Sequence, residues 1–220
     1  IRAQNYLRSE FSNLFARDHL PIDVIISPEV EVGELILQRM AYPGASDIVS
    51  FDDDQVLVLS VPVAEDCAII DTPLHQLTEL FPNLQAMVMG VIRDGEMLAL
   101  KSDDFMIAGD EAIVSVAKDQ VNRVLSMFGR KEELPDKIVI AGAGNVGQYV
   151  ARRLEESRDG ISVRLIETNR VKAQQAAERL EKSIVVYGST LNDEIMREVG
   201  IEQCQMFLGL TNDDETNILS

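Results

Sequence analysis

Residues 137–156 read KIVIAGAGNVGQYVARRLEE, and this stretch decides the fold of the second half of the chain. The apolar run before Gly142 predicts a short buried strand, and the spacing of apolar residues after Gly147 predicts an amphipathic helix. In a G-x-G-x-x-G turn, the first glycine permits the tight bend, the second lets a pyrophosphate approach the main chain, and the third lets the helix pack on the strand. Gly142, Gly144 and Gly147 therefore predict a phosphate-binding turn at the positive end of a helix.

Glu167 lies twenty residues beyond the last glycine, at the end of the apolar run 161–167. A carboxylate at this position accepts hydrogen bonds from an adenosine ribose and repels a 2′-phosphate, so the turn favours NAD, NADH or another adenosine phosphate over NADP. Two plainer interpretations stay open: a glycine turn kept only for packing, and a Glu167 that merely caps a helix starting near Asn169. The expected cofactor-binding residues here are Gly142, Ala143, Gly144, Asn145, Val146, Gly147, Glu167 and Thr168.

After Pro135 the sequence alternates between strand and helix patterns. Alternation of this length predicts βαβ units, right-handed crossovers and a parallel sheet of Rossmann-like type. Four strands fit before the sequence stops, so the domain is expected to be incomplete, with the last strand at an edge. The strands are expected at 137–142, 161–167, 183–188 and 206–210, and the helices at 146–157, 170–181, 192–200 and 213–220.

Polar residues follow two further strands of this predicted sheet. Ser189 and Thr190 follow the third strand and are expected near the adenosine, although Thr190 or Asn192 also suits the N-cap of the next helix. Thr211 and Asn212 follow the fourth strand and are expected to face the same crevice. The acidic residues 213–215 fit the first turn of a helix, where they complement its dipole.

The first half predicts an α+β arrangement. An apolar stripe over 1–17 predicts a helix. A strand over 21–29 and a helix over 30–42 follow, and strands then dominate. Asp94-Gly95 between two apolar runs predicts a two-residue hairpin turn. The remaining strands are expected at 46–51, 55–63, 86–93, 96–100 and 111–117, with helices at 73–81 and 119–128 and a domain boundary near 129–136.

The formal charge of −17 excludes several classes of partner. Nucleic-acid binding depends on Lys and Arg meeting phosphates, and no basic patch is visible. An acidic surface is repelled by anionic lipids, and no apolar run is long enough for a membrane helix, so any membrane association is expected to run through a protein partner.

Cys67 and Cys204 are expected to be free thiols in a reducing compartment. Because the chain starts at Ile1 and stops at Ser220 inside an expected helix, we expect it to be a piece of a longer protein.

No catalytic or metal-binding set is predicted. His19 and His75 have no partner pattern and are expected to be ordinary surface or loop residues. The acidic run 52–54 lies within one turn between strands, which favours a solvated turn over a cation site.

The sequence resembles the RCK (also called KTN) regulatory proteins of potassium transport. The matching elements are IVIAGAGNVGQYVARRLE, the strand-end Glu167, SIVVYGST and LGLTNDDETNILS. The stretch from VIISPEVEVGELILQRM to AGDEAIVSVA resembles the C-type ligand-binding subdomain of that family. The resemblance implies four parts: 1–21 as the last helix of a preceding nucleotide-binding domain with its linker, 22–118 as the C-type subdomain, 119–136 as a linker helix, and 137–220 as an incomplete nucleotide-binding domain.

The resemblance also implies a function. It implies a cytoplasmic, non-catalytic subunit that responds to NAD/NADH or to ATP/ADP and gates a membrane-embedded potassium channel or transporter. Such a subunit lies at the inner membrane through that partner and is expected to form a homo-oligomer. Two alternatives stay open: an NAD-dependent dehydrogenase with 22–118 as its substrate domain, and an oligomerisation module without nucleotide affinity. The dehydrogenase is disfavoured because the crevice motifs supply no His, Lys or Tyr for proton transfer.

Overall fold

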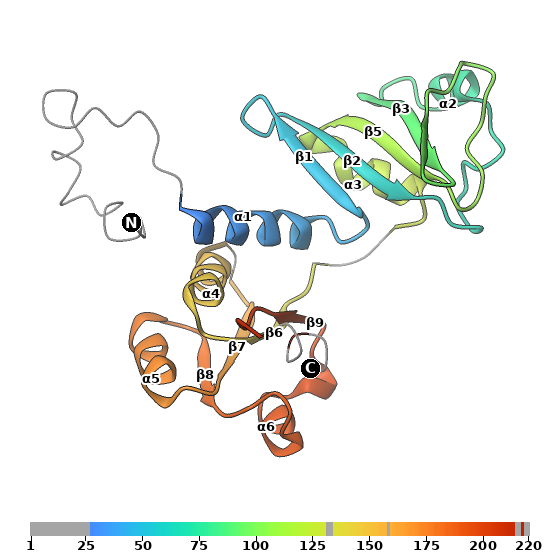
Figure 1. Cartoon of the computed structure of the whole chain (residues 1–220). Coiled ribbons are helices and arrows are strands. Elements are labelled where there is room, and N and C mark those ends of the chain that lie inside the picture. Colours follow the sequence, from blue (N-terminus) through green and yellow to red (C-terminus); the bar gives the residue numbers. More distant parts are fainter. Residues whose placement is uncertain (1–26, 131–133, 158, 214–216, 218–220) are drawn as a thin grey trace, which may run out of the picture. The chain divides into compact units, whose positions relative to one another are not determined.

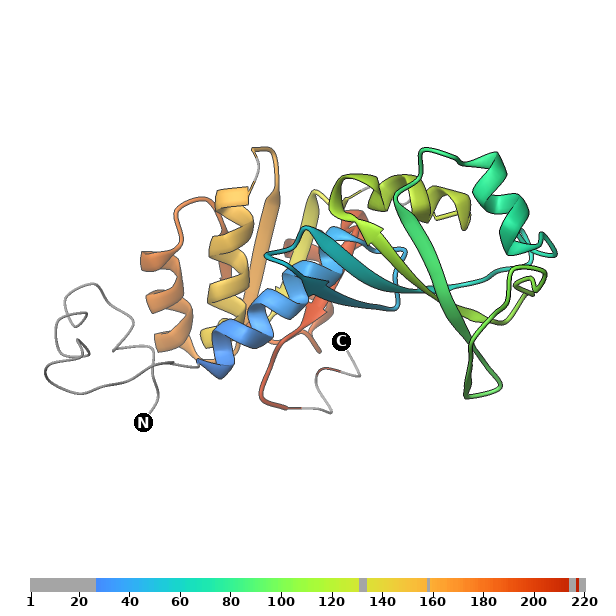
Figure 2. The same cartoon turned by 90° about the horizontal axis from the view of Figure 1, so that it is seen from above.

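A computed structural model describes residues 27–130, 134–157, 159–213 and 217 (Figures 1 and 2). Its contacts divide the chain into two compact units, one formed by 1–37 together with 135–220 and the other by 38–134. The helix expected over 1–17, most of the strand expected over 21–29 and most of the last expected helix lie outside the described residues. The domain boundaries drawn from the sequence stay predictions.

The unit that contains the glycine turn is built on a parallel sheet. Among its described residues, four strands lie in the order β8-β7-β6-β9 and every pair is parallel, which confirms the Rossmann-like sheet predicted from the sequence. The elements are β6 (Lys137–Ala141), α4 (Asn145–Ser157), β7 (Ser162–Glu167), α5 (Arg170–Arg179), β8 (Ile184–Tyr187), α6 (Asp193–Glu198), the 3-10 helix η4 (Ile201–Gln203) and β9 (Met206–Gly209).

The strand order places the crevice of this sheet. From β6 the chain moves to β7 and then β8, and it then returns to the other side of β6 to form β9. Right-handed crossovers therefore put α4 and α5 on one face and α6 on the other. The order reverses between β6 and β9, and ligands of such sheets bind at the carboxyl ends of the strands at this point. As expected, β9 is an edge strand.

The helix α4 is held on this sheet by packing and by one carboxylate. Val150 and Ala151 are fully buried, so the apolar stripe of α4 faces the sheet. At the other end of the helix, Glu155 accepts hydrogen bonds from the main-chain N–H groups of residues 181–183, at 2.6–3.2 Å. This carboxylate fixes the loop that leads into β8.

The other unit is antiparallel and includes short helices, which confirms the predicted α+β class. Its sheet has the order β1-β2-β5-β3-β4. The elements are β1 (Asp47–Phe51), β2 (Val56–Pro62), α2 (Leu74–Leu80), β3 (Ala86–Arg93), β4 (Glu96–Leu98), β5 (Glu111–Ala117), the 3-10 helix η3 (Lys118–Gln120) and α3 (Val121–Met127). The predicted hairpin turn is confirmed, because Asp94 and Gly95 have φ values of 53° and 80°.

The two faces of this sheet differ. The inner face carries fully buried side chains such as Leu59 and Val114 and packs against α3, whose Val121 is also buried. The outer face carries one row across four strands, in which Val49, Val58, Ser115 and Met87 are successive cross-strand partners. Val49 is 50% exposed and Met87 is 63% exposed, so this face presents apolar surface.

The helix α1 (Pro28–Ala41) precedes this unit in the chain. It begins two residues earlier than the sequence pattern predicts. The carbonyl of Ser27 accepts hydrogen bonds from the N–H groups of Val30 and Glu31, so Pro28 occupies the first helical position, where its missing N–H leaves no bond unmade. The residues of α1 up to Leu37 belong to the unit of the glycine turn.

A buried ion pair fixes the loop before β5. The side chain of Asp110 is 1% exposed and accepts from Arg93 Nε at 2.7 Å and Nη2 at 2.8 Å. Its second oxygen also accepts from the main-chain N–H of Ile107 at 2.9 Å. The hydrogen bond from Arg93 lowers the pKa of Asp110, and the bond from Ile107 lowers it further against the opposing effect of burial. The carboxylate therefore stays ionised in the folded protein.

We predict that Asp110→Asn lowers the free energy of unfolding by about 3 kcal/mol, because it leaves the Arg93 guanidinium without its buried counter-ion. The folded-state pKa of Asp110 lies below its unfolded value. Its contribution is therefore present above the unfolded pKa and is lost as the pH falls through the folded pKa. Urea unfolding followed by circular dichroism should show a smaller loss of stability on acidification for the variant. Asp47→Asn, which breaks an exposed pair with Arg39, should cost less than about 1 kcal/mol. Equal costs would contradict this assignment.

Candidate functional site

The glycine bend joins β6 to α4, and its three glycines differ in what surrounds them. Gly142 has φ +101°, and a Cβ there would lie 2.7 Å from the carbonyl oxygen of Leu210. A Cβ on Gly147 would collide with the carbonyl oxygen of Gly142. A Cβ on Gly144 would meet no protein atom within 4 Å. Gly142 and Gly147 are thus required by the fold itself, whereas Gly144 faces open space.

The main chain around Gly144 presents hydrogen-bond donors to that open space. Within the described part of the chain, no acceptor takes the N–H groups of Gly144, Asn145 or Val146. These groups lie at the first turn of α4, where the helix dipole is positive. Gln148 holds the bend in shape, because its side chain donates to the carbonyl of Ala143 at 2.7 Å. The bend can therefore bind an anion through main-chain donors.

Glu167 joins the end of β7 to this bend. The residue is only 9% exposed. One carboxylate oxygen accepts from the N–H of Ala143 at 3.0 Å, and the other accepts from the N–H of Asn169 at 2.9 Å. The α5 cap is Asn169 itself, whose side chain accepts from Val171 and Lys172. Because a carboxylate offers about four acceptor positions, Glu167 keeps capacity for the hydroxyls of a ribose.

Some polar side chains after β8 make hydrogen bonds within the turn that leads into α6. Asn192 is the N-cap of α6, since its side chain accepts from the N–H of Glu194 at 2.8 Å, so Thr190 does not have this role. The hydroxyl of Ser189 accepts from the N–H of Leu191 at 3.2 Å. Thr190 is 8% exposed.

The loop after β9 is closed by Thr211 and Asn217. The Thr211 hydroxyl donates to the side-chain oxygen of Asn217 at 2.7 Å, and the Asn217 amide donates back to the Thr211 carbonyl at 3.1 Å. Asn212 is exposed, as is Thr168 after β7. Residues 214–216 lie outside the described residues, so the role expected for the acids 213–215 stays a prediction.

The structure brings one part of the expected site together. Gly142 lies against Leu210 and Thr211 at the end of β9, and Ala143 is bonded to Glu167 at the end of β7. These groups share the carboxyl end of the sheet, where its strand order reverses. Ser189 and Thr190 follow β8, which β7 separates from β6.

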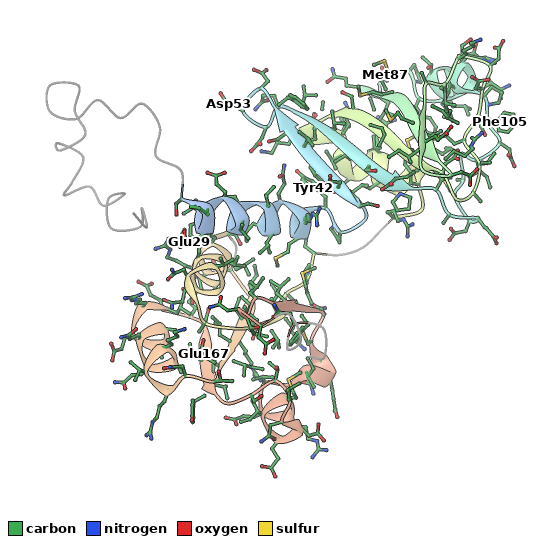
Figure 3. The ribbon with its side chains drawn as sticks, viewed as in Figure 1. Glu29, Tyr42, Asp53, Met87, Phe105 and Glu167 are labelled. Carbon is green, nitrogen blue, oxygen red and sulfur yellow. The ribbon has the colours of Figure 1, made fainter. Side chains whose placement is uncertain are left out.

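One neighbour of this site could not be predicted from the sequence. Glu29, at the start of α1, accepts from the side-chain amide of Asn145 at 3.5 Å. The two residues are 116 positions apart, and no local pattern links them. Figure 3 labels Glu29 and Glu167 in this unit.

Other expectations concern metals and membranes. In the described ranges, no three residues of the types His, Cys, Asp and Glu lie close enough together to hold a metal ion. In those same ranges, no helix is long and apolar enough to cross a membrane. Asp52, Asp53 and Asp54 form an exposed turn with positive φ at each residue. His75 contacts the carbonyl of Ser102 at 3.1 Å, and His19 lies outside the described residues.

Comparison with known proteins supports the resemblance found in the sequence. Residues 138–220 match the model of the TrkA-N domain. The Trk system potassium uptake protein TrkA of Azorhizobium caulinodans is 46% identical over all 220 residues, and that of Vibrio alginolyticus is 34% identical over the same length. Residues 138–220 are thus similar to a TrkA-N domain, and the whole chain is similar in sequence to TrkA. The chain covers 48% and 47% of these two TrkA proteins, so it spans about half of their length.

Solved structures agree on the fold. The crystal structure of the GsuK RCK domain has a TM-score of 0.52 at 18% identity, covering 88% of this chain and 40% of that one. The GsuK channel bound to NAD also has a TM-score of 0.52 at 18% identity, covering 88% of this chain and 33% of that one. At this identity the likeness shows an RCK-type fold and nothing further.

We predict that alanine destabilises the unit at Gly142 but has little effect on its stability at Gly144. Gly142→Ala should destabilise the unit by roughly 2 kcal/mol or more, because alanine disfavours a φ of +101° and its Cβ would press on Leu210. Gly144→Ala should change stability by less than about 1 kcal/mol, since its Cβ meets no protein atom. Thermal unfolding of the two variants checks this, and a Gly144→Ala variant as unstable as Gly142→Ala would contradict the open position of Gly144.

Proposed function

We propose that this chain is the nucleotide-binding, regulatory part of a TrkA-type potassium uptake protein. The observation that carries the proposal is the open position above Gly144, which is lined by free main-chain donors and lies beside the buried carboxylate of Glu167. Phosphates would bind the N–H groups at the start of α4, and Glu167 would accept from the adenosine ribose. The family relationship over the whole chain supports this role.

The proposed ligands are NAD or NADH, with ATP or ADP as the second pair. NADP fits less well, because the carboxylate of Glu167 would repel a 2′-phosphate. Thr168, Ser189, Thr190, Thr211 and Asn212 complete the proposed site.

The proposed role is regulation without catalysis. Among the described residues, the groups gathered at the glycine bend are main-chain amides, side-chain amides and the carboxylates of Glu29 and Glu167. Hydride transfer usually needs a positioned His, Lys or Tyr beside the nicotinamide. Different affinities of a ligand for two conformations of the protein would bias a membrane-embedded potassium channel or transporter. The protein would lie in the cytoplasm, at the inner membrane through this partner.

Two further expectations belong to this proposal. We infer that residues 22–118 act as a C-type subdomain, joined by 119–136 to the nucleotide-binding domain at 137–220, with 1–21 as the end of a preceding domain. Self-association stays a prediction, and the exposed apolar row that includes Val49 and Met87 supports it.

Calorimetry on the full chain tests the proposal, with NADH, NAD, ATP and ADP as ligands. We expect binding of adenosine phosphates to the wild type and its loss in Gly144→Val, because valine fills the space that the phosphates need. This variant is preferable to Glu167→Ala, which would also leave the N–H groups of Ala143 and Asn169 without acceptors and so destabilise the fold.

A matched control keeps the test specific. Gly95→Asn alters an exposed turn of the other unit, where a Cβ also meets no protein atom and asparagine tolerates the φ of +80°, and should leave binding intact. Normal binding by a folded Gly144→Val would show that the ligand lies elsewhere. Steady consumption of NADH with a carbonyl substrate would replace the regulatory role by a dehydrogenase.

A further inference from the structure

The start of α1 is held against α4 by a set of specific contacts. Glu34 accepts hydrogen bonds from the hydroxyl of Tyr149 and from Nε of Arg153, the latter at 3.1 Å. Gly33 is buried directly on the Tyr149 ring, where any Cβ would collide with ring carbons. All of these residues belong to the unit of the glycine turn.

The protonation states favour this arrangement. Burial raises the pKa of Tyr149, and the hydrogen bond to Glu34 raises it further, so the hydroxyl keeps its proton and donates it. The charge of Glu34 raises the pKa of Arg153, which therefore stays a cation. We call the four residues Gly33, Glu34, Tyr149 and Arg153 the α1 clasp.

The α1 clasp fixes the position of a second acid. Glu29 lies five residues before Glu34, so it is more than one helical turn nearer the start of α1. The start of α4 lies at the same end of the contact between the two helices. Its carboxylate is half-buried, 3.5 Å from the side-chain amide of Asn145 and 3.4 Å from the hydroxyl of Ser27. A negative charge thus stands beside the first residue of α4, whose main-chain N–H is one of the donors that the proposed phosphates would use. Figure 3 labels Glu29.

We propose that Glu29 sets the charge preference of the nucleotide site, so that it disfavours a triphosphate relative to the pyrophosphate diester of NAD or NADH. This inference rests on the proposed function. The repulsion between a fixed carboxylate and a bound anion grows with the charge of the anion, and a triphosphate carries more charge than a pyrophosphate diester. Glu29 lies within a Debye length of the bend, so salt does not screen it fully. The dinucleotide is therefore the favoured ligand.

The same contact links the ligand to α1 by reciprocity. If the contact of Glu29 with Asn145 weakens anion binding by a given factor, a bound anion weakens that contact by the same factor. The helix runs on without a break to Ala41. Binding of an anion at the glycine bend would thus first change the contacts at the start of α1.

The test compares Glu29→Gln with Glu31→Gln on the full chain. Both variants remove one negative charge from the first turns of α1, but Glu31 is exposed and its side chain makes no hydrogen bond within the described residues. Glutamine at position 29 can still accept from Asn145 and Ser27, so the change removes charge and keeps the contact. Calorimetry with ATP, NADH and adenosine is the measurement, at low and at physiological salt.

We expect Glu29→Gln to tighten ATP binding about two- to fivefold, NADH binding less and adenosine binding not at all, as a unit charge several ångströms away implies. Glu31→Gln should leave all three near wild type, and added salt should shrink the gain. Adding Tyr149→Phe, which loosens the α1 clasp, should reduce the gain from Glu29→Gln. Equal gains for ATP and NADH, or equal effects of the two charge variants, would overturn the role of Glu29.

The outcomes also separate this inference from the proposed function. If the wild type binds ATP and NADH and the Gly144→Val variant binds neither, the proposed nucleotide site is supported, whatever the results for the Glu29 variant. If the wild type binds neither ligand, the proposed function fails and the role of Glu29 fails with it.

Discussion

The hydrogen bond from the N–H of Ala143 to the carboxylate of Glu167 fixes the geometry on which the site depends. It joins the bend after β6 to the end of β7 across 24 residues of sequence, and the second oxygen of the same carboxylate holds the N–H of Asn169 at the start of α5. One buried charge thus sets both the direction of the glycine bend and the start of the next helix. The open donors of α4 lie at the crevice because this carboxylate holds the bend in place.

Among the described residues, each unit contains one buried carboxylate, and the two differ in how much hydrogen-bond acceptor capacity they keep. The side chain of Asp110 is 1% exposed, and its two oxygens take three donors, two of them from a guanidinium that neutralises its charge. Glu167 takes two main-chain donors and meets no counter-ion among the described residues. A carboxylate that is neutralised and mostly occupied by donors stabilises a fold, whereas one with more acceptor capacity left at the edge of a crevice can also bind a ligand.

Much of the fold could be predicted from the sequence because its signals are local. The parallel strands, the hairpin at Asp94-Gly95 and the glycine bend each depend on residues within a few positions of one another. The α1 clasp could not be predicted in this way, because Glu34 and Tyr149 lie 115 positions apart and neither belongs to a recognised pattern. The sequence also left two caps possible for α6, and only the geometry of the turn selects Asn192 over Thr190.

The acidity of the chain raises the question of how it could bind an anion at all. At physiological ionic strength, the Debye length is about 8 Å, so most of the 37 acidic residues act weakly on the glycine bend. Free main-chain donors and the helix dipole act at hydrogen-bonding distance, where screening is slight. The net charge therefore sets the partners that the surface repels, while the few charges nearest the bend set which anion it prefers. Glu29 is such a charge, because the packing of Gly33 on the Tyr149 ring holds its helix beside α4.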